Sequence, residues 1–236
     1  MTILTVIRTF CQRTGLPAPG FVAASQDAQV VQLLALANEV IEDLVDRWTW
    51  QDLVKEATFV TIAGEDQGAI ATIAPSGFSR ILQETIFNRT LRLPLFGPLA
   101  ASQWQGLKAL PNPGPNYRYR IRGGRLLFSP AGVVGQTCAF EYASRNAAIG
   151  ADSVAKPAFT LDTDNFLLPE SLLMAGLRWK WKSEKGLDYA EEFRRYEILA
   201  NNAAGRDGTK PRLAMDGGCA SAVPGIFVPA GNWNVP

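Results

Sequence analysis

Residues 117–128 read YRYRIRGGRLLF and predict a β-hairpin. In the first half of this stretch, aromatic or aliphatic residues alternate with arginines, which is typical of a strand with one buried face. Gly123 and Gly124 are residues that a two-residue hairpin turn favours, and the letters LLF that follow form the returning strand. Residues 137–144, TCAFEYAS, predict a third strand shortly after it.

Weaker signals of β structure precede the hairpin. Apolar and polar residues roughly alternate over residues 56–62, and short apolar runs follow at 80–88 and 90–93. A short helix is predicted over 99–110, where a cluster of prolines ends it. Together with the hairpin, these segments predict a small antiparallel β domain.

Helical periodicity lies on both sides of this β segment. Residues 2–14 and about 27–48 carry apolar residues at helical spacing, and the second segment is apolar around most of its circumference. Such a helix packs between several partners, as in a bundle. Two further helices are predicted, one from Pro169 to Gly186 and one over 188–204.

The simplest assembly is an α+β protein in which N- and C-terminal helices form a bundle and the β domain is inserted between them. An extended C-terminal tail follows the last helix. The segment before the third helix has little apolar periodicity and predicts a surface loop. The predicted divisions are bundle helices at 1–52, the inserted β domain with one short helix at 53–150, the loop at 151–168, bundle helices at 169–204 and the extended arm at 205–236.

Composition argues against an enzyme. The 236 residues have a formal net charge of +1 and include no histidine, which removes the Ser-His-Asp and Cys-His centres and His-ligated zinc. Cys11, Cys138 and Cys219 lie far apart and without a CxxC pair, so neither a zinc knuckle nor a disulfide framework is predicted. No cofactor motif, such as GxGxxG or a P-loop, is present, and we predict no cofactor or metal.

The apolar runs of the sequence are too short for a membrane helix, and the first ten residues lack the long apolar core of a signal peptide. We therefore expect a soluble protein that is made in the cytoplasm and has no membrane partner. The balanced charge also gives no bulk attraction to nucleic acid.

Residues 178–182, RWKWK, interleave basic and aromatic side chains. A protein that binds single-stranded nucleic acid uses such residues to stack bases and hold phosphates. On a helix, however, successive residues point about 100° apart and form no single platform. We favour core tryptophans whose basic neighbours extend to water.

Residues 162–165, DTDN, contain half of a calcium-loop pattern, but the glycine and the distal glutamate of an EF-hand are missing. Solvation of the loop or capping of a helix explains these residues better than metal binding.

Two groups of residues are candidates for contact with a partner. We expect four arginines on the outer face of the hairpin, where they are candidates for contact with DNA or with an acidic protein surface: Arg118, Arg120, Arg122 and Arg125. A solvated sheet face is the alternative.

The second group lies in the glycine- and proline-rich C-terminal arm, which carries apolar residues that a solvated linker would not normally carry. They predict an arm that becomes ordered on a partner, with Ile226, Phe227, Val228, Trp233 and Val235 as the interface residues. A tail packed on its own subunit, or frayed, is the alternative.

The order and spacing of several motifs resemble tailed-phage head-to-tail adaptor proteins, the group that contains the podophage tail tubular protein A. The resemblance covers residues 2–208 and includes the Arg47–Trp50 step, RWTW, into the β segment. Its first block is YRIRGGRLLFSP at 119–130, Gly135 and AFEYAS at 139–144. Its second block is LPESLL at 168–173, GLRWKW at 176–181, GLDY at 186–189 and RYE at 195–197.

This resemblance implies a structural virion protein at the head-tail junction. It implies a homo-oligomeric ring, commonly of twelve copies, that binds the portal protein, extends the DNA channel and docks the tail or next neck protein. Double-stranded DNA would pass through the channel without specific binding, and the family has no catalytic residues to carry over. A tail-completion or terminator ring is the first alternative, and a small nucleic-acid-binding module is the second.

Overall fold

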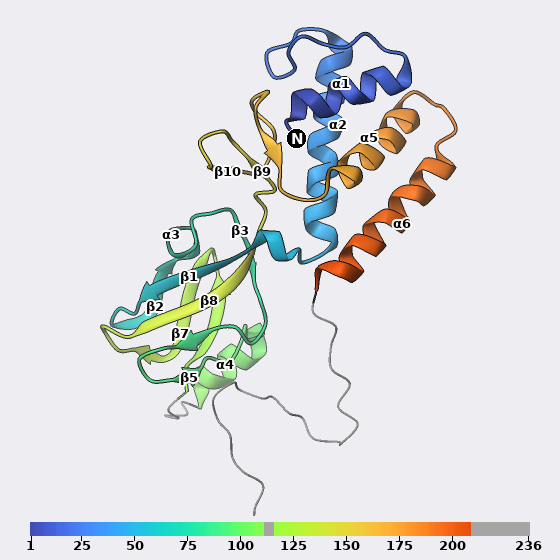
Figure 1. Cartoon of the computed structure of the whole chain (residues 1–236). Helices are drawn as coiled ribbons and strands as arrows, with labels where there is room; N and C mark the ends of the chain where they lie inside the picture. Colours follow the sequence, from blue (N-terminus) through green and yellow to red (C-terminus); the bar gives the residue numbers. More distant parts are fainter. Residues whose placement is uncertain (111–115, 209–236) are drawn as a thin grey trace, which may run out of the picture.

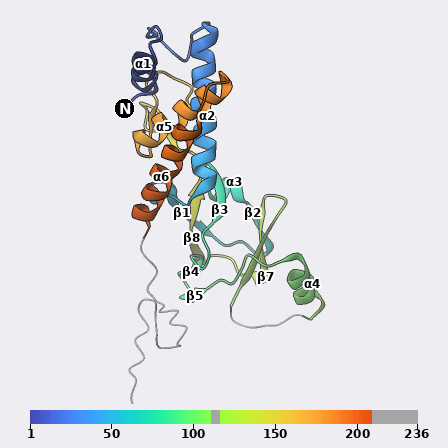
Figure 2. The ribbon, with the colours of Figure 1, turned by 90° about the vertical axis from the view of Figure 1, so that its right-hand side faces the viewer.

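The computed structural model describes residues 1–110 and 116–208, which form a helical bundle and a β domain at opposite ends of the molecule (Figures 1 and 2). The bundle contains two helices from each end of the described chain: α1 (Ile3–Thr14), α2 (Ala28–Arg47), α5 (Glu170–Glu184) and α6 (Ala190–Asp207). The intervening chain supplies the β domain, so the predicted α+β fold with an inserted antiparallel β region is confirmed.

Local sequence signals set the ends of the first two helices. Thr2 caps α1 by accepting a hydrogen bond from the Thr5 amide, and Gly15 ends it with a φ of 73°, which a residue without a Cβ adopts at little cost. The carboxylate of Asp27 accepts a hydrogen bond from the Gln29 amide at the start of α2. These three residues lie within one or two positions of the helix boundaries that the sequence predicts.

The bundle core contains aliphatic and aromatic side chains, and all four helices contribute to it. Helix α5 approaches α2 and α6 closely at Gly176, which has no side chain and lies against Val40 of α2 and Tyr196 of α6. The largest fully buried side chains of α1 and α2 are Ile3, Ile7, Phe10, Leu33, Ile41 and Leu44. None of the helices in the described ranges is long and apolar enough to cross a bilayer.

The β domain packs two antiparallel sheets around an aromatic core. The first sheet has the order β1-β8-β4-β5, with β3 also paired to β8, and the second has the order β2-β7-β6. Phe59 of the first sheet lies 6.1 Å from Phe128 of the second, measured between ring centroids, which places the two inner faces in contact. The strands are β1 (Val54–Val60), β2 (Gly64–Ala69), β3 (Phe78–Ile81), β4 (Phe87–Asn88), β5 (Leu93–Pro94), β6 (Arg118–Arg122), β7 (Arg125–Gly132) and β8 (Thr137–Ser144).

The hairpin forms as its sequence predicts, with Tyr119 opposite Phe128 and Arg122 opposite Arg125. By contrast, β2 reads GEDQGA, which carries no strand signal, and it pairs with β7 through two register shifts. Three short helical segments complete the domain and its junction: 3-10 helix η1 (Gln51–Leu53), α3 (Ile70–Ile73) and α4 (Ala101–Ala109).

The segment predicted as a surface loop, 151–168, is irregular over most of its length, but part of it is buried and paired in a sheet. This segment and the residues before it form a small sheet of β9 (Ala148–Ile149), β10 (Ala155–Lys156) and β11 (Asn165–Phe166) in the order β10-β9-β11. Phe159, Phe166 and Leu168 are buried in the bundle core. Because these side chains are irregularly spaced, no period in the sequence revealed their burial.

Candidate functional site

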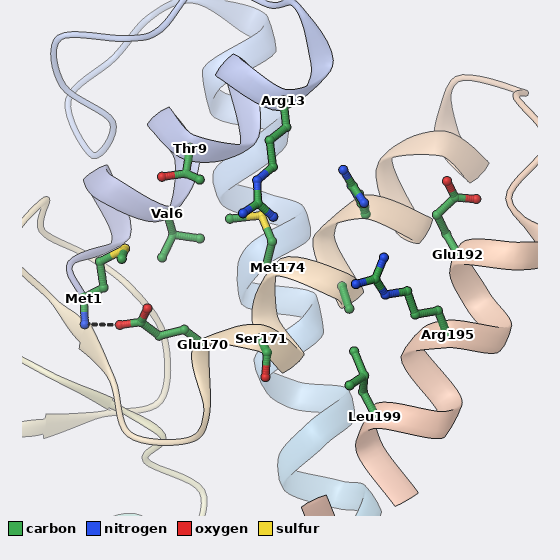
Figure 3. A pocket seen from close by; sticks show the side chains of 12 residues that line it. Met1, Val6, Thr9, Arg13, Glu170, Ser171, Met174, Glu192, Arg195 and Leu199 are labelled. Carbon is green, nitrogen blue, oxygen red and sulfur yellow. Dashed lines mark ion pairs between the residues drawn. The ribbon is translucent and has the colours of Figure 1, made fainter. Parts of the chain in front are cut away.

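A groove lies on the surface of the helical bundle. It has a volume of about 310 Å³ and lies where α1, α5 and α6 meet (Figure 3). Each helix contributes one stripe at helical spacing. The stripes are Val6, Thr9 and Arg13 on α1; Ser171, Met174, Ala175 and Arg178 on α5; and Glu192, Arg195 and Leu199 on α6.

Three arginines give this groove a positive charge. Its two carboxylates are already paired, Glu170 with the amino group of Met1 and Glu192 with Lys182. The hydrogen bond from Lys182 is the main reason that the pKa of Glu192 is lowered. Arg13, Arg178 and Arg195 form no ion pair with any residue that the structure describes, and we call this site the arginine groove.

The floor of the arginine groove is apolar. Met174 of α5 lies between Val6 of α1 and Leu199 of α6 (Figure 3), and Ala175 of α5 also lines the groove. An apolar floor with cationic edges suits a partner that presents aliphatic groups beside carboxylates. The titratable groups that line the groove are three arginines, the amino group of Met1 and two paired carboxylates.

The RWKWK stretch does not form a stacking platform. Trp179 packs against Tyr189, Phe193 and Tyr196, whereas Trp181 lies on another side of α5 against Phe10. The two tryptophans are therefore packed against the bundle core, as the helical geometry predicted.

The expectation that the basic neighbours extend to water is wrong for Lys180, whose side chain is 7% exposed. Its ammonium lies 2.6 Å from a carboxylate oxygen of Glu39 and 2.6 Å from one of Asp43. Burial favours the neutral amine, but the hydrogen bonds to the two carboxylates outweigh it and the pKa of Lys180 is raised. Lys180 therefore connects α5 to α2.

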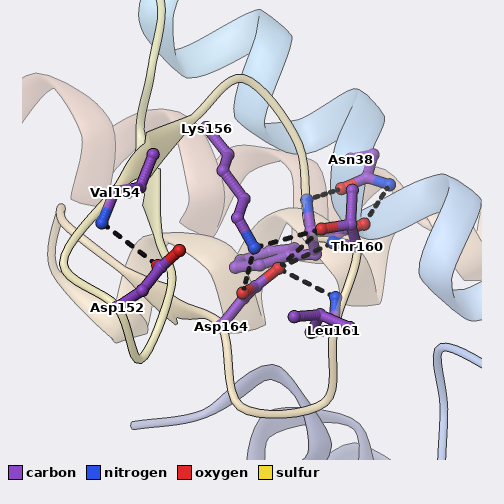
Figure 4. Close-up of polar contacts among 8 residues, drawn as sticks. Asn38, Asp152, Val154, Lys156, Thr160, Leu161 and Asp164 are labelled. Carbon is purple, nitrogen blue, oxygen red and sulfur yellow. Dashed lines mark hydrogen bonds and ion pairs between the residues drawn. The ribbon is translucent and has the colours of Figure 1, made fainter.

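The DTDN residues form a structural clamp between the segment before α5 and the rest of the bundle. Asp164 is fully buried, and its carboxylate accepts hydrogen bonds from the Lys156 ammonium at 2.9 Å and from the amides of Thr160 and Leu161 at 2.7 and 2.9 Å (Figure 4). The side-chain carbonyl of Asn38 in α2 accepts from the Phe159 amide at 2.8 Å. No group of three or more potential metal ligands occurs within the described ranges.

The same clamp holds the N-terminal segment. The Asp162 carboxylate accepts hydrogen bonds from the amides of Val22 and Ala23 at 2.9 and 2.7 Å. The carbonyl oxygen of Asp164 accepts a hydrogen bond from the first amide of α1, that of Ile3, at 2.9 Å. Residues 162–164 thus join segments about 140 positions apart in sequence.

The four arginines of the hairpin share one face of the second sheet, because Arg118, Arg120 and Arg122 alternate along β6 and Arg125 pairs opposite Arg122. Arg122 and Arg125 are exposed, whereas Arg118 and Arg120 are half-buried. Arg125 is not free, since its guanidinium lies 2.5 Å from a carboxylate oxygen of Asp66 on β2.

Comparison with known proteins identifies the family. A family model described as SU10 adaptor protein matches residues 1–216. The chain belongs to the SU10 adaptor protein family. No curated protein matches the sequence.

The family assignment makes the protein a structural phage adaptor and a virion component, and the family is not an enzyme class. The match spans the bundle and the β domain, so both parts of the adaptor carry the family pattern.

Burial raises the pKa of Cys138 to about 11 and also raises the pKa of Cys11, which keeps both thiols protonated.

Two outcomes concern the residues chosen from the sequence. The C-terminal group, Ile226, Phe227, Val228, Trp233 and Val235, lies outside the described residues and outside the family match. The sequence reasoning also missed Arg13 and Arg195 of the arginine groove. Each occupies a regular stripe on its own helix, but only the packing of the helices brings the stripes together.

Proposed function

We propose that this adaptor forms a ring of about twelve copies beneath the portal, at one vertex of the capsid. The ring extends the DNA channel and provides the docking surface for the tail or the next neck protein. The observation that carries this proposal is the match to the SU10 adaptor protein model over residues 1–216. Synthesis in the host cytoplasm and incorporation at the head-tail junction follow from this role.

The charge of the adaptor supports passage of DNA without specific binding. A formal net charge of +1 on 236 residues gives little counterion release on contact with a duplex, so DNA slides past a channel wall of this kind. In this proposal Arg118, Arg120, Arg122 and Arg125 face the channel or a partner, with Arg125 partly neutralised by Asp66.

The C-terminal arm provides the contact with the portal or with a neighbouring subunit in this proposal. Residues 205–236 carry six glycines and four prolines together with apolar anchors, a composition suited to an extended segment that binds along a partner.

Native mass spectrometry of the adaptor, alone and mixed with the portal of the same virus, tests the function. We expect about twelve copies to bind each portal ring. Failure to bind the portal, combined with binding to the tail tube, would contradict this proposal and support a tail-completion ring.

Deletion of residues 209–236 tests the arm separately. We expect the truncated adaptor to keep the circular dichroism and melting temperature of the bundle and β domain but to lose assembly on the portal. Normal assembly of the truncated protein would contradict the role of the arm.

A further inference from the structure

The exposed side of α2 carries a charge complementary to that of the arginine groove. Its exposed stripe includes Glu39, Glu42 and Asp46, with Asp43 exposed beside them. Glu42 and Asp46 form no ion pair with any described residue, and the single ammonium of Lys180 serves both Glu39 and Asp43. Three negative charges therefore remain over the last two turns of α2, and we call this surface the acidic face.

The acidic face also has an apolar end. One and two turns before Glu39 lie Ala35 and Val31, and Val31 is 48% exposed. The stripe from Val31 to Asp46 runs about 22 Å along the helix. An exposed valine next to a small alanine and a row of carboxylates matches a partner with an apolar floor and cationic edges.

The acidic face lies on the exposed side of α2, opposite the side on which α2 buries Leu33, Val40 and Leu44 in the bundle core. When the groove faces the viewer, α2 passes behind α1 and α5 (Figure 3). The acidic face and the arginine groove therefore cannot meet within one copy. A contact between two different surfaces of a subunit is heterologous, and repetition of such a contact with a small rotation closes a ring.

We propose that the acidic face of one copy binds in the arginine groove of the next copy. Val31 and Ala35 lie toward the apolar floor formed by Met174, Ala175 and Leu199, and Glu42 and Asp46 pair with the groove arginines. Three uncompensated cations in the groove meet three uncompensated charges on α2, so both surfaces are neutralised by the same contact. This inference rests on the proposed ring and names its lateral interface.

Charge reversal on each surface tests the interface. The groove variant is Arg178→Glu with Arg195→Glu, and the face variant is Glu42→Arg with Asp46→Arg. Alone, each variant juxtaposes like charges at every lateral contact, and we expect assembly on the portal to fall by at least about tenfold. The control is Arg194→Glu with Arg206→Glu, which makes the same charge change on exposed positions of α6 outside the groove.

Complementation distinguishes a specific contact from general damage. An equal mixture of the groove and face variants restores opposite charges at every contact of an alternating ring, so we expect assembly to recover. The chain that carries all four reversals should assemble as well. Assembly of either single-surface variant at the wild-type level would overturn the proposal. So would failure of both the mixture and the four-reversal chain while the chains remain folded by circular dichroism.

A portal-free measurement separates this inference from the proposed function. In a background with Cys219→Ser, Ala35→Cys places a thiol on the acidic face and Leu199→Cys places one in the groove, with all charges kept. A short bismaleimide should crosslink the two chains when they are mixed and should give no dimer with either chain alone. Crosslinking without any recruitment of the wild type to the portal would support the interface and contradict the portal role. Recruitment of the wild type without a crosslink would support the portal role and contradict the interface.

Discussion

The helical bundle and the β domain are stabilised in different ways. The bundle is built from two distant parts of the chain, and polar contacts of two buried residues join those parts. The carbonyl oxygen of Asp164 accepts a hydrogen bond from the Ile3 amide, and the ammonium of Lys180 contacts the Asp43 carboxylate. The β domain comes from one continuous stretch and has an aromatic core, with its ion pairs on the surface. The β domain also needs long-range pairing, since β1 pairs with β8 and β2 pairs with β7, but all of these strands lie between the two halves of the bundle in the sequence. The bundle is closed by both ends of the described chain, so its contacts must also fix the position of one end relative to the other.

The largest expected effect is a loss of stability that is confined to the core of the β domain. Phe128 is fully buried between the two sheets, and Phe128→Ala should cost about 3–5 kcal/mol of stability in the β domain. Hydrogen exchange should then accelerate at amides of β6, β7 and β8 and stay unchanged in α1, α2, α5 and α6. The matched control is Phe96→Ala. Phe96 is 50% exposed, so its replacement should lower the free energy of unfolding only slightly. Equal acceleration in the bundle would show that the two regions unfold as one unit.

The corresponding change in the bundle removes the buried carboxylate. Asp164→Ala leaves the Lys156 ammonium and two amides without their acceptor, and we expect a loss of about 3 kcal/mol. This loss should be measurable as a lower melting temperature and as faster hydrogen exchange of the amides in α1 and α2. Asp152→Ala is the control, since Asp152 is exposed and accepts one amide hydrogen bond at 3.2 Å. A similar loss in the control would contradict a special role for the clamp.

Acid should weaken the bundle through the same residue. Burial alone would raise the pKa of Asp164, but its hydrogen bonds with the Thr160 and Leu161 amides and with Lys156 outweigh burial, so the pKa is lowered. A depressed folded-state pKa means that the stabilisation is complete above the unfolded value, near pH 4, and is lost as pH falls below it. Asp164→Asn should therefore flatten the stability curve below about pH 4. An unchanged acid slope in denaturant titrations would refute this assignment.

A smaller effect is expected where the bundle helices approach most closely. A Cβ on Gly176 would lie 2.5 Å from a methyl carbon of Val40, so Gly176→Ala should cost about 1 kcal/mol after its gain in helix propensity. A Cβ on Gly205 of α6 would meet no atom within 4 Å, so Gly205→Ala should raise the free energy of unfolding by up to about 1 kcal/mol. Thermal melts of the pair give the comparison, and equal shifts would contradict the close packing of α2 and α5.

The smallest effect is expected for a surface ion pair of the β domain. Arg89 and Glu56 pair across exposed positions, with side chains 56% and 50% exposed. Arg89→Ala should change the free energy of unfolding by about 0–1 kcal/mol and lose even that in high salt. A loss as large as that of Asp164→Ala would remove the distinction between the two regions.

Much of the fold follows from local sequence patterns. The hairpin at 117–128 forms because strict alternation and a glycine pair leave the backbone few other choices. The ends of α1 and α2 follow from capping by Thr2, Asp27 and Gly15. These signals act over one to four residues, so a single sequence contains all the information that they need.

The tertiary structure alone decided the rest. The burial of Asp164, the strand formed by GEDQGA and the assembly of the arginine groove depend on which distant segments meet. Sequence determined the helices, the hairpin and the absence of histidine chemistry, because each is a property of a residue and its close neighbours. The groove exists only after packing aligns one stripe from each of three helices. Each stripe is periodic on its own helix, but the period of one helix does not specify which stripes of other helices will lie beside it.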